Sequence, residues 1–155
     1  MSMNRRKFLK GGSGATVMAL AASAGLLPAN PAFAAWNEAA FKTKSLNDTV
    51  KALGGQTAAE SKDIVITSPD IAENGAVVPI SVTSKIGNTE SISILIEKNP
   101  NSLAANFSIP SGTEPFVSTR VKMGQTSNVY ALVKAGGQYF FVTKEIKVTL
   151  GGCGG

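Results

Sequence analysis

The sequence predicts an all-β protein: an immunoglobulin-like antiparallel β-sandwich, preceded by a short N-terminal helix and followed by a flexible, glycine-rich C-terminal arm. Three observations lead to this fold class. Seven short β-prone segments, each closed by a turn signal, succeed one another from residue 62 onward. Apolar residues at helical spacing precede them. The last five residues are four glycines around one cysteine, a composition that favours neither helix nor strand.

The first 34 residues indicate an export signal. Arg5 and Arg6 form a twin-arginine pair, followed by a 13-residue apolar stretch at 15–27. That stretch is shorter than the roughly 20 residues of a membrane-spanning helix. Ala32 and Ala34, on either side of Phe33, provide an A-x-A cleavage pattern. We therefore predict a twin-arginine signal peptide and a periplasmic mature protein; an ordinary secretory signal is the alternative, and it would also export the chain.

Four segments follow from these patterns: the signal (1–34), a short helical segment (35–54), a β-sandwich domain (55–150) and the arm (151–155). Without the signal, 11 basic residues stand against 10 acidic ones, a formal net charge of +1. A net charge this close to zero favours neither a nucleic-acid partner nor, for the mature chain, a membrane surface.

A helix is predicted at 45–53, because Ser45 can cap its start and Gly54 can end it. Its apolar face comprises three residues at i, i+4 and i+7: Leu46, Val50 and Leu53. Another helical turn is expected just before it, around Trp36 and Phe41. Trp36 is interpreted as a core or interface anchor rather than a ligand platform.

The seven predicted strands are at 64–66, 77–82, 91–97, 104–109, 115–122, 128–134 and 139–150. Alternation predicts one apolar face of the strand at 91–97, formed by Ile92, Ile94 and Ile96. In the strand at 128–134, Val129, Ala131 and Val133 alternate with Tyr130 and Leu132. Residues 70–75 are expected to form a polar connection, with a positive φ and a tight turn at Asn74-Gly75. Pro79 has no N–H, so it predicts an edge strand or a bulge. Gly136-Gly137 predicts a hairpin turn before the last strand.

The residues available for chemistry are few. The chain has no histidine and one cysteine, which excludes Ser-His-Asp and Cys-His catalysis and histidine-ligated metals. Its carboxylates show no paired spacing, and no phosphate-binding glycine loop lies between a strand and a helix. We therefore predict a protein that is not an enzyme and holds neither a metal nor another cofactor.

The arm carries the one reactive group. Cys153 lies between glycines on both sides: Gly151, Gly152, Gly154 and Gly155. In an exported protein, an unpaired cysteine is either reactive or destined for an intermolecular bond. Three residues separate it from Leu150, so the thiol reaches at most about 10 Å beyond the last strand. Free thiols have a pKa of about 8.5, so activation would have to come from an enzyme into which the arm is inserted.

The C-terminal Gly-Gly-Cys-Gly-Gly, the twin-arginine leader and the segment Ala72-Glu73-Asn74-Gly75-Ala76-Val77-Val78-Pro79 resemble the SoxY family. That family is the sulfur-carrier subunit of the periplasmic thiosulfate-oxidising Sox system. The resemblance implies that Cys153 carries pathway intermediates covalently, beginning as a thiosulfonate. It also implies a heterodimer with a SoxZ-like sandwich subunit. Further implied partners are a c-type cytochrome, a manganese hydrolase and a molybdenum sulfane dehydrogenase; the carrier itself has no cofactor.

Two other functions are also compatible with the sequence. An exported immunoglobulin-like structural subunit could be disulfide-linked to a partner through Cys153. A copper chaperone could use Cys153 with Met123, since soft sulfur ligands suit copper(I). We also expect aromatic surface that a second chain covers, formed by Trp36, Phe41, Tyr139, Phe140 and Phe141.

Overall fold

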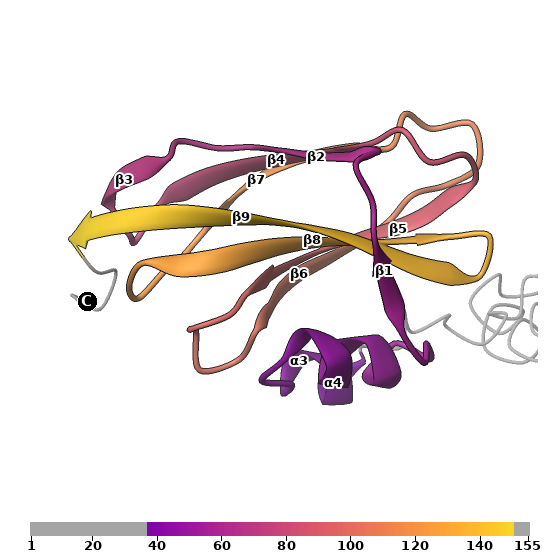
Figure 1. The fold of residues 1–155 in the computed structure, drawn as a ribbon, viewed down its shortest axis with the longest axis horizontal. Helices are drawn as coiled ribbons and strands as arrows, with labels where there is room; N and C mark the ends of the chain where they lie inside the picture. Colours follow the sequence, from indigo (N-terminus) through magenta and orange to yellow (C-terminus); the bar gives the residue numbers. More distant parts are fainter. Residues whose placement is uncertain (1–36, 151–155) are drawn as a thin grey trace, which may run out of the picture. The chain divides into compact units, whose positions relative to one another are not determined.

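The computed structural model describes residues 37–150. The predictions for the signal peptide, for Trp36 and for the arm lie outside these residues. The described chain forms two β-sheets packed face to face, with two short helices on the outer face of the larger sheet (Figure 1). This arrangement confirms the predicted β-sandwich with a preceding helix.

The larger sheet has six strands, in the order β1-β9-β8-β5-β6, and β3 lies along a further part of β9. Their bounds are β1 Ala58–Glu60, β3 Ile71–Asn74, β5 Thr89–Ile96, β6 Leu103–Ser108, β8 Ser127–Ala135 and β9 Gln138–Leu150. The smaller sheet has the order β2-β4-β7, with β2 Ile64–Thr67, β4 Val78–Ser84 and β7 Phe116–Val121. Seven of these strands correspond to the seven predicted ones.

The main core lies between the two sheets. On β5, the predicted apolar face of Ile92, Ile94 and Ile96 is fully buried there. On β8, Val129 and Val133 point to the same core, whereas Leu132 on the opposite face packs toward the helices. The larger sheet is therefore apolar on both faces, which explains why β5 has five consecutive buried residues.

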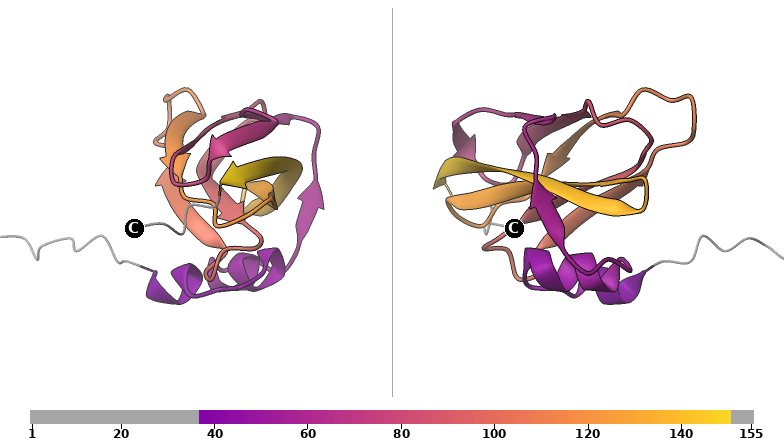
Figure 2. Two further views of the ribbon diagram at one scale, coloured as in Figure 1. Left: turned by 90° about the vertical axis from the view of Figure 1, so that its left-hand side faces the viewer. Right: turned by 45° about the vertical axis from the view of Figure 1, so that its right-hand side comes forward.

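The helical segment covers the outer face of the larger sheet, as Figure 2 shows from two further sides. Helix α3 spans Glu38–Phe41 and helix α4 spans Leu46–Ala52. The Ser45 side chain accepts a bond from the Asp48 N–H, and Gly54 ends the segment with φ +90°. Val50 is fully buried against Tyr139 and its neighbours, so the predicted caps and apolar face are confirmed.

Two strands were not predicted. The segment 70–75, expected to be a polar connection, contains β3, which pairs in parallel with the end of β9. Three-residue β1 also pairs in parallel with β9. The prediction of a connection was wrong because the exposed edge of β9 captures a segment whose own residues have little strand propensity. The turn after Asn74 is present, but neither Asn74 nor Gly75 has a positive φ.

Pro79 lies on the middle strand of the smaller sheet, so the prediction of an edge strand was wrong for β4 as a whole. Its position nevertheless explains how a proline is tolerated. The pairing with β2 covers Ser81 to Ser84 only, and Pro79 has a partner on one side, Arg120 of β7. A residue with one neighbouring strand needs to supply hydrogen bonds on one edge alone.

Candidate functional site

The predicted site residues lie outside the described part of the chain: Cys153, Gly151, Gly152, Gly154, Gly155, and Arg5 and Arg6 of the signal. The structure describes instead the point at which the arm leaves the fold, which is Leu150, the last residue of β9. We call the region around it the arm root, defined as Lys147 to Leu150, β3, Gly75 and Thr126.

The last four residues of β9 are not paired with β8. Pairing between the two strands runs from Gln138 to Ile146, which lies opposite Ser127, and goes no further. Beyond Ile146, β9 pairs on its other edge with β3, so that Ala72 lies opposite Val148 and Asn74 opposite Leu150. The strand thus extends past its own hairpin and is held there by a different partner.

Hydrogen bonds fix each of these residues. The Lys147 N–H donates to the Asp70 carbonyl at 2.9 Å, and the Val148 N–H donates to the Thr126 hydroxyl oxygen at 2.9 Å. The Thr149 hydroxyl donates to the Glu73 carbonyl at 3.1 Å. Finally, the Leu150 carbonyl accepts from the Gly75 N–H at 2.8 Å. The backbone is therefore anchored up to the residue before the arm.

Gly75 is anchored in its turn to the core. Its carbonyl accepts a 2.7 Å bond from the N–H of Met123, whose side chain is completely buried between the sheets. The Asn74 side chain accepts from the Ala76 N–H at 2.8 Å and fixes the turn. Because the Met123 sulfur lies in the core, it is not available to a copper ion at Cys153, which argues against the chaperone hypothesis.

The arm root exposes apolar side chains. Leu150 is 69% exposed and Val77, which follows the Asn74-Gly75 turn, is 52% exposed. Both residues adjoin Asn74: Leu150 by its register with β3, and Val77 by a 3.4 Å bond from its N–H to the Asn74 carbonyl. Exposed apolar side chains that lie next to one another, here at and beside the arm root, are a candidate contact surface.

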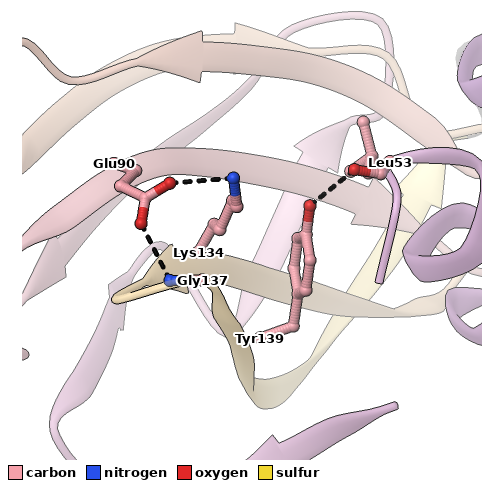
Figure 3. A network of polar contacts seen from close by, with 5 residues as sticks. All are labelled: Leu53, Glu90, Lys134, Gly137 and Tyr139. Carbon is pink, nitrogen blue, oxygen red and sulfur yellow. Dashed lines mark hydrogen bonds and ion pairs between the residues drawn. The ribbon is translucent and has the colours of Figure 1, made fainter. Parts of the chain in front are cut away.

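The opposite end of β9, at the Gly136-Gly137 hairpin, is held by charges. The Glu90 carboxylate forms an ion pair with Lys134 at 2.8 Å and accepts the Gly137 N–H at 2.9 Å (Figure 3). The Lys134 ammonium, and then the Gly137 N–H, lower the pKa of Glu90, and Glu90 raises the pKa of Lys134. The predicted hairpin turn is confirmed, and both of its glycines have positive φ.

Two tyrosines lie on the helix side of the larger sheet. The Tyr139 hydroxyl donates to the Leu53 carbonyl at 2.8 Å, and burial raises the pKa of Tyr139 (Figure 3). The Tyr130 hydroxyl bonds Glu97 at 3.2 Å; burial first, and then the Glu97 charge, raise its pKa. Both phenols are thus held in their neutral form, and neither is poised as a base or a nucleophile near neutral pH.

These aromatic residues also correct one expectation. Tyr139 is only 6% exposed, Phe140 packs against the core between the sheets, and Phe41 and Phe141 pack in the cluster under the helices. Of the five residues expected on this surface, Tyr139 is therefore buried and three phenylalanines are partly buried, while Trp36 lies outside the described residues. The apolar residues left exposed are different ones: Val65, Ile71, Val77, Phe116 and Leu150.

Two surface pockets flank the helical segment and lie far from the arm root. One of about 490 Å³ is lined by Gly54, Gly55 and the start of β9, and one of about 510 Å³ by Lys44, Tyr130 and Thr143 among others. Thr143 precedes Leu150 by seven residues of extended strand, which is about 23 Å. An arm that reaches about 10 Å beyond Leu150 does not extend to either pocket.

Among residues 37–150, no three His, Cys, Asp or Glu side chains come together as a possible metal site. Within the same range, neither helix has the length and apolar character needed to cross a bilayer. Sequence reasoning missed Thr126, β3 and Gly75 as supports of the arm root. A threonine that precedes a strand has no recognisable sequence pattern, because its contact with β9 depends on how far β9 extends beyond its pairing with β8.

Comparison with known proteins gives a family. A sequence model described as "Sulfur oxidation protein SoxY" matches residues 50–153. No curated protein sequence matches the chain significantly. Among solved structures, the sulfur carrier protein SoxY from Chlorobium limicola f thiosulfatophilum is similar, with 38% identity and a TM-score of 0.62. That match covers 68% of this chain and 96% of the other.

Two further structures are more distant. A chain from a structure of T cell activation by the bacterial superantigen toxic shock syndrome toxin-1 has 14% identity and a TM-score of 0.38, over 55% of this chain and 98% of that one. The human F-spondin reeler domain has 10% identity and a TM-score of 0.38, over 60% and 93%. Likenesses of this size support no conclusion. The family model, in contrast, matches more than half of the sequence and includes Cys153, and the SoxY structure is 38% identical. The chain therefore belongs to the SoxY family of sulfur oxidation proteins.

Proposed function

We propose that this protein is a covalent sulfur carrier: it holds intermediates of thiosulfate oxidation on the thiol of Cys153 and presents them to enzymes, without catalysis of its own. One observation carries the proposal: β9 is anchored up to Leu150, and the chain passes from there directly into the glycine-flanked cysteine. Membership of the SoxY family supports it, as does the similar structure, which is named a sulfur carrier protein.

The short arm restricts where an enzyme can bind. Cys153 lies three residues beyond Leu150, a span of at most about 10 Å. An enzyme that takes the thiol into a channel must therefore bring the channel mouth against the arm root. The exposed Leu150 and Val77 side chains suit contact with an apolar rim. Glycines next to the cysteine keep the inserted segment narrow.

The proposed chemistry takes place on the Cys153 sulfur. In loading, the thiolate and thiosulfate join through a new S–S bond as Cys–S–S–SO₃⁻, and two electrons pass to partner cytochromes, one to each of two haems. In hydrolysis, water attacks the sulfonate sulfur, the bond between the sulfonate sulfur and the neighbouring sulfur breaks, and sulfate, two protons and Cys–S–S⁻ result. The described side chains contribute no general base to these steps, so we assign activation to the partner enzymes.

The proposed partners are those of the pathway: a SoxZ-like subunit in a heterodimer, a c-type cytochrome, a manganese hydrolase and, where present, a sulfane dehydrogenase. The bare outer face of the smaller sheet, where Val65 and Phe116 remain exposed, is available for a second sandwich subunit. We assign the protein to the periplasm by the twin-arginine route, from Arg5 and Arg6. Nucleic acid and, for the mature chain, a membrane are not among the proposed partners.

Intact-mass spectrometry of the protein from thiosulfate-grown cells tests this function. The wild-type protein should be found in the periplasmic fraction with a reductant-labile mass increase from added sulfur, and Cys153→Ser should show none. Replacing Arg5 and Arg6 with lysine should leave the protein unexported and unloaded. A protein without sulfur adduct, present as one stable disulfide-linked species, would contradict the carrier function and support a structural subunit instead.

A further inference from the structure

We propose that Thr126 is a positioning residue that fixes the pivot of the carrier arm at Leu150. The proposal rests on the carrier function above and concerns the same site. Its basis is the geometry of the last four residues of β9, which extend beyond the strand that pairs with the rest of β9. A carrier arm needs a defined starting point, because the distance over which its thiol can be delivered is counted from the last fixed residue.

The Thr126 hydroxyl substitutes for a missing strand. In an antiparallel pair, β8 would continue to accept hydrogen bonds from β9 beyond Ile146, but β8 begins at Ser127. The side chain of the preceding residue takes over: Thr126 Oγ1 accepts the Val148 N–H at 2.9 Å, in a partly buried position. This bond restrains the β8-side edge of the strand two residues before Leu150.

The other edge alone holds the strand end less firmly. Strand β3 has four residues, three of which are exposed, and it pairs with no strand other than β9 within residues 37–150. Short exposed elements with few buried contacts are those that open by local unfolding. Without the Thr126 bond, the end of β9 is held on its β3 edge alone, where Ala72 is buried and Gly75 bonds Met123, and this end can fray from Val148, which is only partly buried.

Release of this end would lengthen the arm. Counted from Leu150, Cys153 is the third residue, whereas counted from Ile146, the last residue paired with β8, it is the seventh. The effective concentration of a tethered group falls roughly as the −3/2 power of tether length, so this change predicts a loss of about three-fold. The loss should appear in binding of the arm by an enzyme, not in the chemistry once the arm is bound.

Thr126→Val is the direct test, because valine keeps the β-branched shape and removes the hydroxyl. Thr126→Ser restores an acceptor and is the rescue variant. Thr143→Val is the matched control: it makes the same substitution on β9, at an exposed residue that lines the distant pocket. All variants are made in the mature chain and compared for amide hydrogen exchange at Val148 and at Gly75, whose N–H bonds the Leu150 carbonyl, with the buried Val129 as an internal reference.

Turnover is measured on carrier loaded chemically. Tetrathionate and the Cys153 thiolate give Cys–S–S–SO₃⁻ and release thiosulfate, so loading needs no partner enzyme. The manganese hydrolase of the proposed pathway is then assayed by sulfate release. We expect Thr126→Val to speed exchange at Val148 and Gly75 by roughly ten-fold. It should raise KM with kcat unchanged, by up to about three-fold when the strand end is released in most molecules. Thr126→Ser and Thr143→Val should behave as wild type.

Exchange and KM of Thr126→Val that equal those of wild type would overturn the proposal. So would faster exchange with unchanged KM, because the bond would then be structural only. A fall in kcat at constant KM would also contradict it, since that result places the effect in the chemical step. If the hydrolase releases no sulfate from loaded wild-type carrier, the proposed function itself fails and the positioning role with it; the exchange data still report whether the bond holds the strand.

Discussion

The two ends of β9 are held in different ways. At the hairpin end, a carboxylate, an ammonium and a backbone N–H meet around Glu90, and Tyr139 packs beneath the helical segment with its hydroxyl on Leu53 (Figure 3). At the arm root, the hydrogen bonds are between neutral groups: the Thr126 hydroxyl oxygen accepts the Val148 N–H, and the other bonds join β9 to the carbonyls of Asp70 and Glu73 and to the Gly75 N–H. Leu150 lies exposed beside them.

Under the proposed function, the hairpin end of β9 stabilises the fold, whereas the arm root presents the arm to partner enzymes. The hairpin end is covered by the chain's own helices and contributes to the buried cluster beneath them. The arm root is anchored, but its apolar side chains face outward, which suits contact with another protein. The Thr126, Glu73 and Gly75 bonds at the arm root join neutral groups, so salt should affect them weakly. One ion pair lies at its base: Asp70, whose carbonyl accepts the Lys147 N–H, pairs with Lys144 at 3.0 Å. Changes at one end should therefore leave the other unaffected.

The largest effect on stability is expected for Gly55→Ala. A Cβ at residue 55 would lie 2.6 Å from the Tyr139 ring and 2.8 Å from the Val50 side chain. Overpacking of this kind costs about 1–3 kcal/mol of unfolding free energy, and we expect the upper half of that range because Tyr139 is also fixed by Leu53. Denaturant unfolding measures the loss.

Gly87→Ala is the matched control, because a Cβ there meets nothing within 4 Å. It should change the unfolding free energy by no more than about 0.5 kcal/mol. Folded Gly55→Ala protein should still be loaded at Cys153 at the wild-type rate. Equal stability of the two variants would show that the helical segment is not packed on β9 as described.

A smaller effect is expected from pH. The pKa of Glu90 is lowered in the folded protein, so its contribution to stability is present above the ordinary value of 4.5 and is lost as pH falls through the lowered pKa. Conversely, Lys134 has a raised pKa, so its contribution is complete below 10.5 and is lost as pH rises above that value. Both side chains are partly exposed, so added salt should weaken the pair.

Hydrogen exchange of the Gly137 amide, corrected for its intrinsic pH dependence, measures this effect. Its protection should fall as pH falls through the lowered pKa of Glu90, while that of the Val148 amide, which bonds the neutral Thr126 hydroxyl, should not. Glu90→Gln should show reduced protection at Gly137 at every pH and lose the acid step. An acid step of equal size at both ends would contradict the distinction between a charged and a neutral attachment.

Much of the fold follows from local patterns in the sequence. Alternation identified the buried faces of β5 and β8, and Ser45 and Gly54 identified the limits of α4. The predictions failed where a segment takes its structure from a neighbour. Neither Ala58–Glu60 nor Ile71–Asn74 has a strand pattern of its own, and both become strands because β9 offers them an open edge.

The candidate site likewise has one part that the sequence predicts and one part that it does not. Composition predicts Cys153 and its glycines, because a lone thiol among glycines is visible in the sequence. The arm root is not predictable in this way. Thr126 matters because β8 starts one residue later while β9 runs four residues past Ile146, and that mismatch exists only in the folded register. Likewise, the burial of Tyr139, expected on the surface, depends on Gly55 and Leu53 nearby.

Turnover of Gly152→Val and Gly154→Val tests the central claim, that Cys153 works on a narrow arm beyond an anchored strand, most directly. The variants should retain wild-type unfolding free energy and titrate one thiol each, since their sites lie beyond the last strand. In the reconstituted thiosulfate-oxidising system, kcat/KM should fall about ten-fold, or about 1.4 kcal/mol, because a β-branched side chain widens the arm and restricts its backbone. Turnover at the wild-type rate would contradict the account, since the glycines would then have no part in delivery.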